Sequence, residues 1–235
     1  MAPPRATGRE QASLIDPGVV ALQKRAAAKA AADEVLDGMS VGLGTGSTVA
    51  HLLSELAGRR LRDVRYVATS PATEQAARSL GLTLLALDDI VPLDLAVDGA
   101  DQIDPECWLI KGGGAAHTRE KIIAAAARRF VVIASAEKAV RELSPPVPLE
   151  LLSFGSFATL AELGDAHLRE VPPSPDGGLI ADYFGPIDDP RTLSARLAET
   201  PGVVEHGLFA PELVSEIVIA RPGGIERRAG AKPAS

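Results

Sequence analysis

Three consecutive glycines follow a lysine at Lys111–Gly114, and this segment constrains the fold more than any other in the chain. It lies between an apolar run that ends at Ile110 and an alanine-rich helical pattern that begins near Ile122. Glycine allows positive φ and lets a ligand approach the main chain, but it costs entropy on folding, so an idle loop has little reason to contain three in a row. We therefore expect a strand, a functional turn and a helix in succession.

A carboxylate follows the glycines at the expected start of the helix. Glu120 falls in the first turn of the expected helix, where the helix dipole favours the charged form of its side chain. The cation of Lys111, the open backbone and the carboxylate together predict an oxyanion stabiliser and a base that face one small anionic substrate. Taken alone, the segment fits a flexible turn with two solvated charges equally well, so the choice between the two interpretations depends on the rest of the chain.

A second glycine-rich turn, Gly42–Thr48, predicts an anion site. It connects an apolar strand at 39–43 to a helix, and free N–H groups at a helix N-terminus favour a negatively charged ligand. A dinucleotide fingerprint needs glycine at the position of Ser47 and an acidic residue after the next strand, and a nucleotide P-loop needs a lysine; the sequence has none of these. Because Thr45, Ser47 and Thr48 add hydroxyl groups around Gly46, we expect a cradle for a single phosphate.

Two aspartates, Asp98 and Asp101, follow a strand expected at 93–97. The carboxyl ends of strands are where open α/β sheets hold their ligands. Asp-Gly is also common in ordinary turns, so this tetrapeptide taken alone strongly favours a plain structural turn. An Asp-x-x-Asp pair suits Mg²⁺ as well, but no third carboxylate has a convincing spacing, and we expect no metal site.

Apolar strands and helical segments alternate as far as about residue 145. This alternation predicts an α/β fold with a doubly wound, mostly parallel, Rossmann-like sheet. A helix should begin at Asp16, as its cap, and continue to Gly38. Strands are expected, besides those already described, at 64–68, 82–87, 107–110 and 130–134.

The proline-rich segment Pro145–Pro148 predicts a domain boundary. We expect a catalytic domain at 1–145 and a smaller α+β domain at 146–216. A late strand near 217–220 should bring the segment 217–235 back to the first sheet. The termini, residues 1–13 and 226–235, are expected to be disordered or frayed.

Composition excludes several classes of protein. The formal net charge of −7 argues against general nucleic-acid binding, which requires a basic face. The single cysteine, Cys107, excludes a disulfide framework, and its apolar neighbours suggest a core thiol. No apolar segment has the length of a signal peptide core or a membrane span, so the expected location is the cytoplasm.

Taken together, these motifs resemble ribose-5-phosphate isomerase of type A, an enzyme of the non-oxidative pentose phosphate pathway. The resemblance covers roughly residues 20 to 225. Its most specific motif is the lysine and three glycines followed by Thr-Arg-Glu-Lys. The matching stretches are VGLGTGST at Val41–Thr48, DGAD at Asp98–Asp101, KGGGAAHTREKIIA at Lys111–Ala124 and PGVVEHGLFA at Pro201–Ala210.

The resemblance implies an aldose–ketose isomerase that passes a proton between C1 and C2 through an enediol(ate). Glu120 would transfer the proton, Lys111 would stabilise the oxyanion, Asp98 would open the sugar ring and Asp101 would fix hydroxyl groups. The implied binding residues are Lys24, Thr45, Gly46, Ser47, Thr48, Gly99, Ala100, Gly112, Gly113, Gly114 and Lys138. The resemblance further implies no metal or organic cofactor and a homodimer or tetramer, with a small sugar phosphate as the partner.

Several positions depart from the family's usual pattern. Gln102 stands where glutamate is usual, Ser135 where aspartate is usual and Glu137 where serine is usual. Gly178 replaces the last residue of an Asp-Gly-Asn-type turn, and His117 replaces an apolar residue; a packing role for this histidine is expected over a second acid/base role. Two alternatives remain open, an isomerase of another phosphosugar and a non-catalytic sugar-phosphate sensor on the same fold. A sensor would need neither Glu120 nor Lys111.

Overall fold

The computed structural model describes residues 16–232. A six-stranded sheet forms its centre, in the order β13-β12-β6-β3-β1-β2, and all its neighbouring strands are parallel except β12 and β13. The predicted α/β class with a mostly parallel sheet is confirmed. The strands are β1 (Ser40–Leu43), β2 (Arg65–Ala68), β3 (Leu93–Asp98), β6 (Ala127–Ser135), β12 (Glu216–Arg221) and β13 (Gly224–Ala229).

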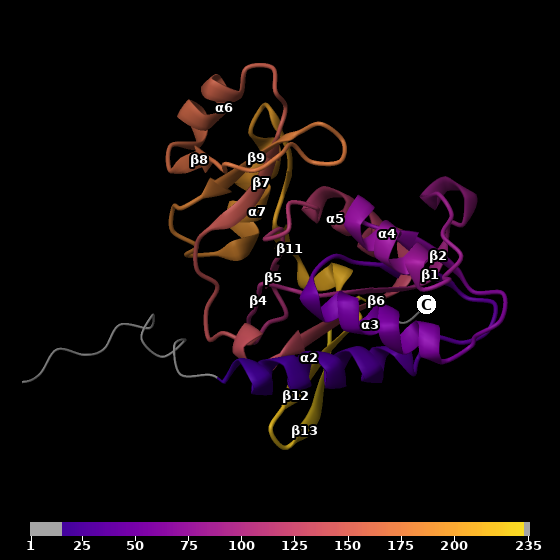
Figure 1. Cartoon of the computed structure of the whole chain (residues 1–235). Helices are drawn as coiled ribbons and strands as arrows, with labels where there is room; N and C mark the ends of the chain where they lie inside the picture. The colour runs from indigo at the N-terminus through magenta and orange to yellow at the C-terminus, as the bar shows by residue number, and fades with distance from the viewer. Residues whose placement is uncertain (1–15, 233–235) are drawn as a thin grey trace, which may run out of the picture.

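Helices cover both faces of this sheet, as alternate side chains of the strands require. On one face, Val131 and Ile133 of β6 share a core with α2 (Pro17–Ala32) and α3 (Ser47–Gly58). On the other face, Val132 and its neighbours pack with α5 (His117–Ala126). The helix α4 (Pro71–Ser79) contributes Ala77 to the first of these two cores. Figure 1 shows the sheet between these layers.

A second, four-stranded sheet is entirely antiparallel, in the order β10-β7-β9-β8. Together with its two helices it forms the upper part of Figure 1 and has its own apolar core. The predicted division of the chain at residues 145 and 216 stays a prediction. The elements are β7 (Val147–Leu151), α6 (Ser156–Leu163), β8 (Ala166–Leu168), β9 (Leu179–Tyr183), α7 (Pro190–Glu199) and β10 (Val203–His206).

A small antiparallel sheet joins the two larger ones. It consists of β11 (Leu208–Phe209), β5 (Leu109–Ile110) and β4 (Gln102–Ile103), in that order. The Lys111 N–H donates to the Gly207 carbonyl at 2.9 Å, and the Gly207 N–H donates to the carbonyl of Pro148, at the start of the four-stranded sheet, at 2.7 Å. Three short 3₁₀ turns complete the described chain, η2 (Leu87–Asp89), η3 (Ala136–Lys138) and η4 (Pro211–Leu213).

Several sequence expectations need correction. The segment 82–87 forms only an isolated bridge between Tyr66 and Leu84 before η2 begins, because no further strand pairs with it. The strand expected at 107–110 is reduced to β5 and lies in the small antiparallel sheet, outside the parallel one. The first helix ends at Ala32, six residues before Gly38.

The structure confirms one expectation for the C-terminal segment and corrects another. The expected return of 217–220 to the first sheet is confirmed, since β12 pairs in parallel with β6. The expected fraying from residue 226 is wrong as far as Ala229, because β13 forms an antiparallel hairpin with β12 and covers its edge. The expectation of disorder at residues 1–13 lies outside the described residues.

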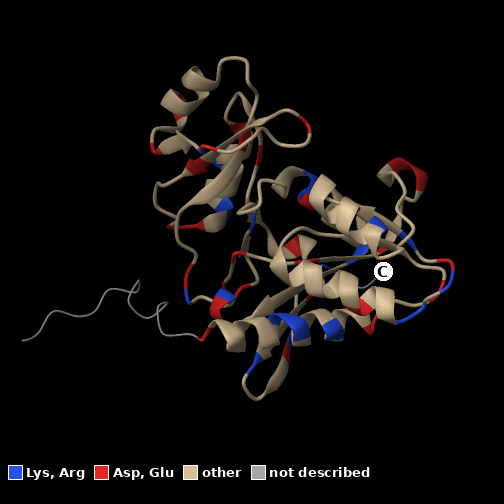
Figure 2. Ribbon diagram, viewed as in Figure 1, with Lys and Arg blue, Asp and Glu red and all other residues tan. Residues whose placement is uncertain are grey.

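Charged residues are distributed without a dominant basic face. The ribbon in Figure 2 shows Lys and Arg positions interspersed with Asp and Glu positions along the chain, and α2 carries the basic residues Lys24, Arg25 and Lys29. Within residues 16–232, none of the helices combines the length and the apolar character that a membrane crossing requires.

Candidate active site

The predicted site lies where the strand order of the parallel sheet reverses. The chain moves from β1 outward to β2 and then crosses to β3 on the opposite side of β1. At such a switch point the loops that follow two neighbouring strands diverge and leave a crevice for a ligand. The loop after β1 carries the glycine-rich turn Gly44–Thr48, and the loop after β3 carries Asp98–Asp101.

Three charged side chains meet below this crevice. The Lys111 ammonium lies 2.9 Å from Asp98 Oδ2 and 3.0 Å from Glu120 Oε2, and it donates to the Gly99 carbonyl at 2.6 Å. The side chains of this cluster are only 3–5% exposed. The three residues come from β3, the loop after β5 and the first turn of α5, so elements far apart in sequence create the cluster.

Burial controls the protonation of this cluster. Burial and the neighbouring charge of Asp98 raise the pKa of Glu120 to about 8, against the opposing attraction of Lys111. Burial also raises the pKa of Asp98. Burial alone would lower the pKa of Lys111, but the two carboxylates more than offset it and raise that pKa above its ordinary value. We infer that one proton is shared by the two carboxyl groups near neutral pH, since the cluster then has no net charge.

Backbone N–H groups fix the position of Asp98. Its Oδ1 accepts hydrogen bonds from the N–H groups of Thr45, at 3.1 Å, and Gly99, at 2.7 Å. A Cβ at Gly44 would lie 1.9 Å from the Asp98 carboxyl carbon, so only glycine allows this close approach. The glycine-rich turn therefore serves the carboxylate cluster as well as the expected phosphate.

The N-terminus of α3 has the geometry expected of a phosphate cradle. Gly46 caps the helix with φ of 119°, and the helix begins at Ser47. The Lys24 ammonium, on α2, lies 2.9 Å from Ser47 Oγ, which places a cation beside the free N–H groups of the first turn. Lys24 is therefore held beside the expected phosphate site by a specific contact.

The hydroxyl of Thr45, expected to face a phosphate, instead contacts residues that follow β2. The Thr45 Oγ1 lies 2.7 Å from Thr69 Oγ1 and donates to Ser70 Oγ at 2.8 Å, and Thr73 Oγ1 donates to the Gly44 carbonyl at 2.9 Å. Thr45 is thus tied to the loop after β2, so the expectation that its hydroxyl faces a phosphate needs correction. The sequence signal for this cluster is the polar pair Thr69-Ser70 directly after a strand that neighbours β1.

The triple-glycine turn forms the opposite wall of the crevice. Gly112 has φ of +107°, and a Cβ there would lie 2.7 Å from both His117 Nδ1 and Pro148 Cβ. The Gly113 N–H donates to Asp101 Oδ2 at 2.8 Å. A further contact, which the sequence did not suggest, comes from Arg169, whose guanidinium donates to the carbonyls of Gly112 and Gly113.

A cavity of about 200 Å³ collects nearly all the predicted residues. Asp98 does not line it, because this carboxylate lies behind Lys111 with both oxygens occupied. The cavity is lined by Lys24, Thr45, Gly46, Ser47, Thr48, Gly99, Ala100, Asp101, Lys111, Gly112, Gly113, Gly114, Glu120 and Lys138.

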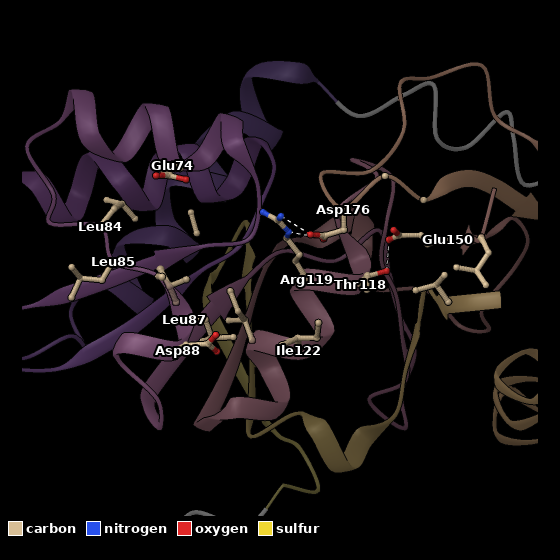
Figure 3. A pocket seen from close by; sticks show the side chains of 18 of the residues that line it. Glu74, Leu84, Leu85, Leu87, Asp88, Thr118, Arg119, Ile122, Glu150 and Asp176 are labelled. Atoms are coloured by element: carbon tan, nitrogen blue, oxygen red, sulfur yellow. Dashed lines mark hydrogen bonds and ion pairs between the residues drawn. The ribbon is translucent and has the colours of Figure 1, made fainter. Parts of the chain in front are cut away.

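A larger cavity, of about 840 Å³, lies on another face of α5. Figure 3 shows Arg119 paired with Asp176 across it and Thr118 donating to Glu150. Much of its lining is apolar, including Leu84, Leu85 and Ile122. The smaller cavity is the better candidate for a reaction site because it contains the buried cation, two carboxylates and the helix N-terminus.

The remaining polar candidates play packing roles. His117 is fully buried beneath Gly112, as a packing role requires, and burial lowers its pKa to about 4. Cys107 is buried, and burial raises the pKa of its thiol. Among residues 16–232 no group of three or more His, Cys, Asp or Glu side chains is placed to hold a metal ion.

The departures from the family pattern form local contacts. The Gln102 side-chain amide donates to the Ser144 carbonyl and its oxygen accepts from the Ser144 N–H. Ser135 donates to Glu137 at 2.7 Å, so a hydroxyl–carboxylate pair spans these positions. Neither contact involves a residue that lines the smaller cavity.

A Rossmann-like sheet with a phosphate cradle and a buried lysine–carboxylate cluster at its switch point defines a class of protein. This arrangement is typical of an enzyme that moves a proton on a small phosphorylated substrate, because a helix N-terminus with a neighbouring lysine suits an anion and the buried ammonium of Lys111 contacts two carboxylates beside it.

Comparison with known proteins identifies the family. The family model of ribose 5-phosphate isomerase A (phosphoriboisomerase A) matches residues 65–224. The ribose-5-phosphate isomerase A of Methanosarcina acetivorans is 46% identical over 217 residues, which cover 86% of this chain and 92% of the relative. That of Roseiflexus castenholzii is 47% identical over 220 residues, which cover 87% and 94%. The chain belongs to the ribose-5-phosphate isomerase A family.

Solved structures agree with this assignment. Ribose 5-phosphate isomerase A from Neisseria gonorrhoeae superposes with a TM-score of 0.86 at 29% identity and covers 90% of this chain and 97% of its own. A D-ribose-5-phosphate isomerase in complex with phospho-erythronic acid superposes with a TM-score of 0.85 at 35% identity, covering 89% and 99%.

Proposed function

We propose that this chain interconverts D-ribose 5-phosphate and D-ribulose 5-phosphate through an enediol(ate). The observation that carries the proposal is the contact between Lys111 and both carboxylates, directly beside a cavity that ends at the N-terminus of α3. Family membership supports the same reaction.

Phosphate binding orients the reacting carbons. The first-turn N–H groups of α3, the Ser47 and Thr48 hydroxyls and the Lys24 and Lys138 ammonium groups surround one end of the cavity. A phosphate held there uses binding energy remote from the reacting carbons to fix their orientation. The C1–C2 end of an extended five-carbon chain then points toward Glu120.

Glu120 transfers the proton. In its ionised form it removes the C2 proton of the open aldose, and the C2–H electron pair becomes the C1–C2 double bond of the enediol(ate) while O1 takes the negative charge or a proton. Glu120 then returns its proton to C1, which takes the C1–C2 double-bond pair, while the O2–H proton passes to O1 and O2 becomes the carbonyl oxygen of the ketose. The Lys111 ammonium and the N–H groups of the glycine turn stabilise the developing oxyanion.

Ring opening fits Asp101 better than Asp98. Asp101 lines the cavity, whereas both oxygens of Asp98 are occupied by Lys111 and two N–H groups. We assign Asp101 the removal of the anomeric hydroxyl proton: as the aldehyde forms at C1, the bond from C1 to the ring oxygen breaks, and Asp101 passes the proton to that oxygen, which becomes a hydroxyl. Asp98 instead holds Lys111 in place and raises the pKa of Glu120.

The experiment that tests the proposal is ribulose 5-phosphate formation from ribose 5-phosphate by the purified protein, with arabinose 5-phosphate as the competing aldose. We expect turnover of ribose 5-phosphate with a kcat/KM at least tenfold higher than that of arabinose 5-phosphate, roughly the discrimination available from one misplaced hydroxyl. Preference for arabinose 5-phosphate would indicate an isomerase of another phosphosugar. Binding of ribose 5-phosphate without turnover would indicate a sensor.

A homo-oligomeric state and a cytoplasmic location are further parts of the proposal, and both rest on the resemblance to the family. Light scattering coupled to gel filtration tests the first, with a mass of two or four chains as the expected result. Fractionation of the source cells tests the second.

A further inference from the structure

Arg169 reaches the active-site turn from the antiparallel part of the molecule. It follows β8, and its Nε and Nη2 form a two-pronged ion pair with Asp182 of β9 at 2.8 and 2.5 Å. Its Nη1 donates to the carbonyl oxygens of Gly112, at 3.0 Å, and Gly113, at 3.2 Å. The side chains of Arg169 and Asp182 are 19% and 15% exposed, so both are largely shielded from water.

These contacts, together with a hydrogen bond from the Ala115 N–H to the Gly112 carbonyl at 3.0 Å, hold the peptide groups of the turn in a fixed orientation. In a trans peptide the C=O and the N–H point in opposite directions. The Gly112 carbonyl faces Arg169, and the N–H of the same peptide group, on Gly113, faces Asp101 at 2.8 Å. The Gly113 carbonyl also faces Arg169, so the N–H of Gly114 must point away from Arg169, toward the cavity that Gly114 lines.

The Gly114 N–H is therefore presented to a ligand. Across the described part of the chain, it has no acceptor. Three consecutive glycines would otherwise sample many backbone orientations, since each has access to both signs of φ. Only fixed donors aimed at the developing charge stabilise an oxyanion without reorganisation.

We propose that Arg169 is a positioning residue for the isomerase reaction: it holds the Gly112 and Gly113 carbonyls so that the Gly114 N–H faces the substrate oxyanion. This inference rests on the proposed function. It gives the four-stranded antiparallel sheet a role in catalysis, because Asp182 on β9 aligns the guanidinium and Arg169 transmits that alignment to the turn.

A guanidinium is required for this arrangement. Its planar group satisfies Asp182 with two N–H donors and still directs a third nitrogen at the two carbonyls. A lysine in its place has one nitrogen and no fixed fork, so it would keep the ion pair and lose control of the turn.

The test compares Arg169→Ala and Arg169→Lys with a matched control, Arg119→Ala. Arg119 also forms a two-pronged ion pair with the antiparallel part of the molecule, through Asp176, but it does not touch the glycine turn (Figure 3). We expect Arg169→Ala to lower kcat by about 10- to 100-fold, the size of effect seen when one oxyanion donor is lost, with KM for ribose 5-phosphate within about threefold of wild type. Arg119→Ala should keep kcat within about twofold.

Two readouts separate positioning from general stability. Added methylguanidinium should restore part of the kcat of Arg169→Ala and leave the wild type and Arg119→Ala unchanged. Amide hydrogen exchange over residues 112–116 should accelerate in Arg169→Ala and remain at the wild-type rate in Arg119→Ala. If Arg169→Ala does not fold, Arg169→Lys provides the test, with a smaller loss of kcat at unchanged KM and the same acceleration of exchange.

The inference is overturned if the folded Arg169 variants keep the wild-type kcat, or if kcat falls without rescue and with unchanged exchange in the turn. A wild-type protein that does not isomerise ribose 5-phosphate would instead refute the proposed function. The exchange measurement distinguishes the two failures, because it reports the order of the turn whatever the substrate is.

Discussion

Lys111 determines the chemistry at the scale of single residues. It contacts two carboxylates at once, and with one shared proton the cluster is neutral. A carboxylate whose pKa is raised to about 8 is a stronger base, once ionised, than a solvent-exposed glutamate. Burial and the charge of Asp98 therefore lower the fraction of Glu120 that is ionised and, at the same time, increase the basicity of the ionised form.

The pH dependence of kcat/KM should reveal this cluster. Because Glu120 must be ionised to remove a proton, kcat/KM should fall as the pH drops through the raised pKa, with a midpoint far above the ordinary value of 4.5 and near 8. Asp98→Asn removes the charge that raises the pKa of Glu120. Burial still raises the pKa in that variant, but without the neighbouring charge the midpoint should move to lower pH. A pH–rate profile of both proteins checks this, and an unchanged or higher midpoint in Asp98→Asn would refute the coupling.

Sequence reasoning identified most of the residues that meet at the cavity, but not the contacts that hold them there. Glu120 and Lys111 stand next to a triple glycine, which is a local signal. The burial of Asp98 behind Lys111 and the tie from Thr45 to Thr69 depend on how three loops converge, and no local pattern encodes that convergence. Arg169 was missed for the same reason, since it lies 56 residues from Gly113 along the chain.

At the scale of elements, the N-terminus of α3 and the start of α5 act on opposite ends of the substrate. In the proposed reaction, the first binds the phosphate and the second presents Glu120. The α5 N-terminus receives the turn from β5, a strand of two residues in a separate antiparallel sheet. The sequence suggested a longer buried strand at that place because its apolar run, 107–110, matches a strand in hydrophobicity, and antiparallel pairing of only two residues leaves no pattern of its own.

Loss of the Ser47 hydroxyl should weaken binding more than turnover. Ser47→Ala removes one donor to the phosphate and the partner of Lys24, so KM should rise about tenfold, the value of one hydrogen bond to a charged group, while kcat falls by less. Ser54→Ala on the same helix is the matched control, because its hydroxyl donates only to the Ala50 carbonyl within the helix. Steady-state kinetics of both variants test this prediction. Equal KM values for Ser47→Ala and Ser54→Ala would refute the phosphate cradle.

At the scale of the whole molecule, the site depends on both large sheets. The parallel sheet supplies the switch point, while the antiparallel sheet meets the glycine turn through Arg169 and through the bonds of Gly207 to Lys111 and Pro148. The alternation of strands and helices predicted the first sheet. The short strands and turns of the second predicted an α+β unit, but not its position against the active site, because that position depends on contacts between distant segments.

These connections predict that the two sheets unfold together. Trp108, the single tryptophan, is buried in the core of the antiparallel sheet and next to β5, so its fluorescence reports on that sheet and on the junction. Far-UV circular dichroism reports on the whole chain. The two signals should give the same midpoint in a urea titration. A fluorescence midpoint at lower urea than the dichroism midpoint would mean that the antiparallel unit unfolds on its own.

The central claim is that Glu120 carries the proton between C2 and C1. It is tested most directly by incubating ribose 5-phosphate in D₂O with the wild type and with Glu120→Gln, and following deuterium in the sugar by NMR. We predict deuterium at C1 of ribulose 5-phosphate and at C2 of recovered ribose 5-phosphate with the wild type. Glu120→Gln should show at least a 100-fold slower incorporation, in the range expected for loss of a general base, although ribose 5-phosphate still raises its melting temperature. Incorporation by Glu120→Gln at the wild-type rate would contradict the account.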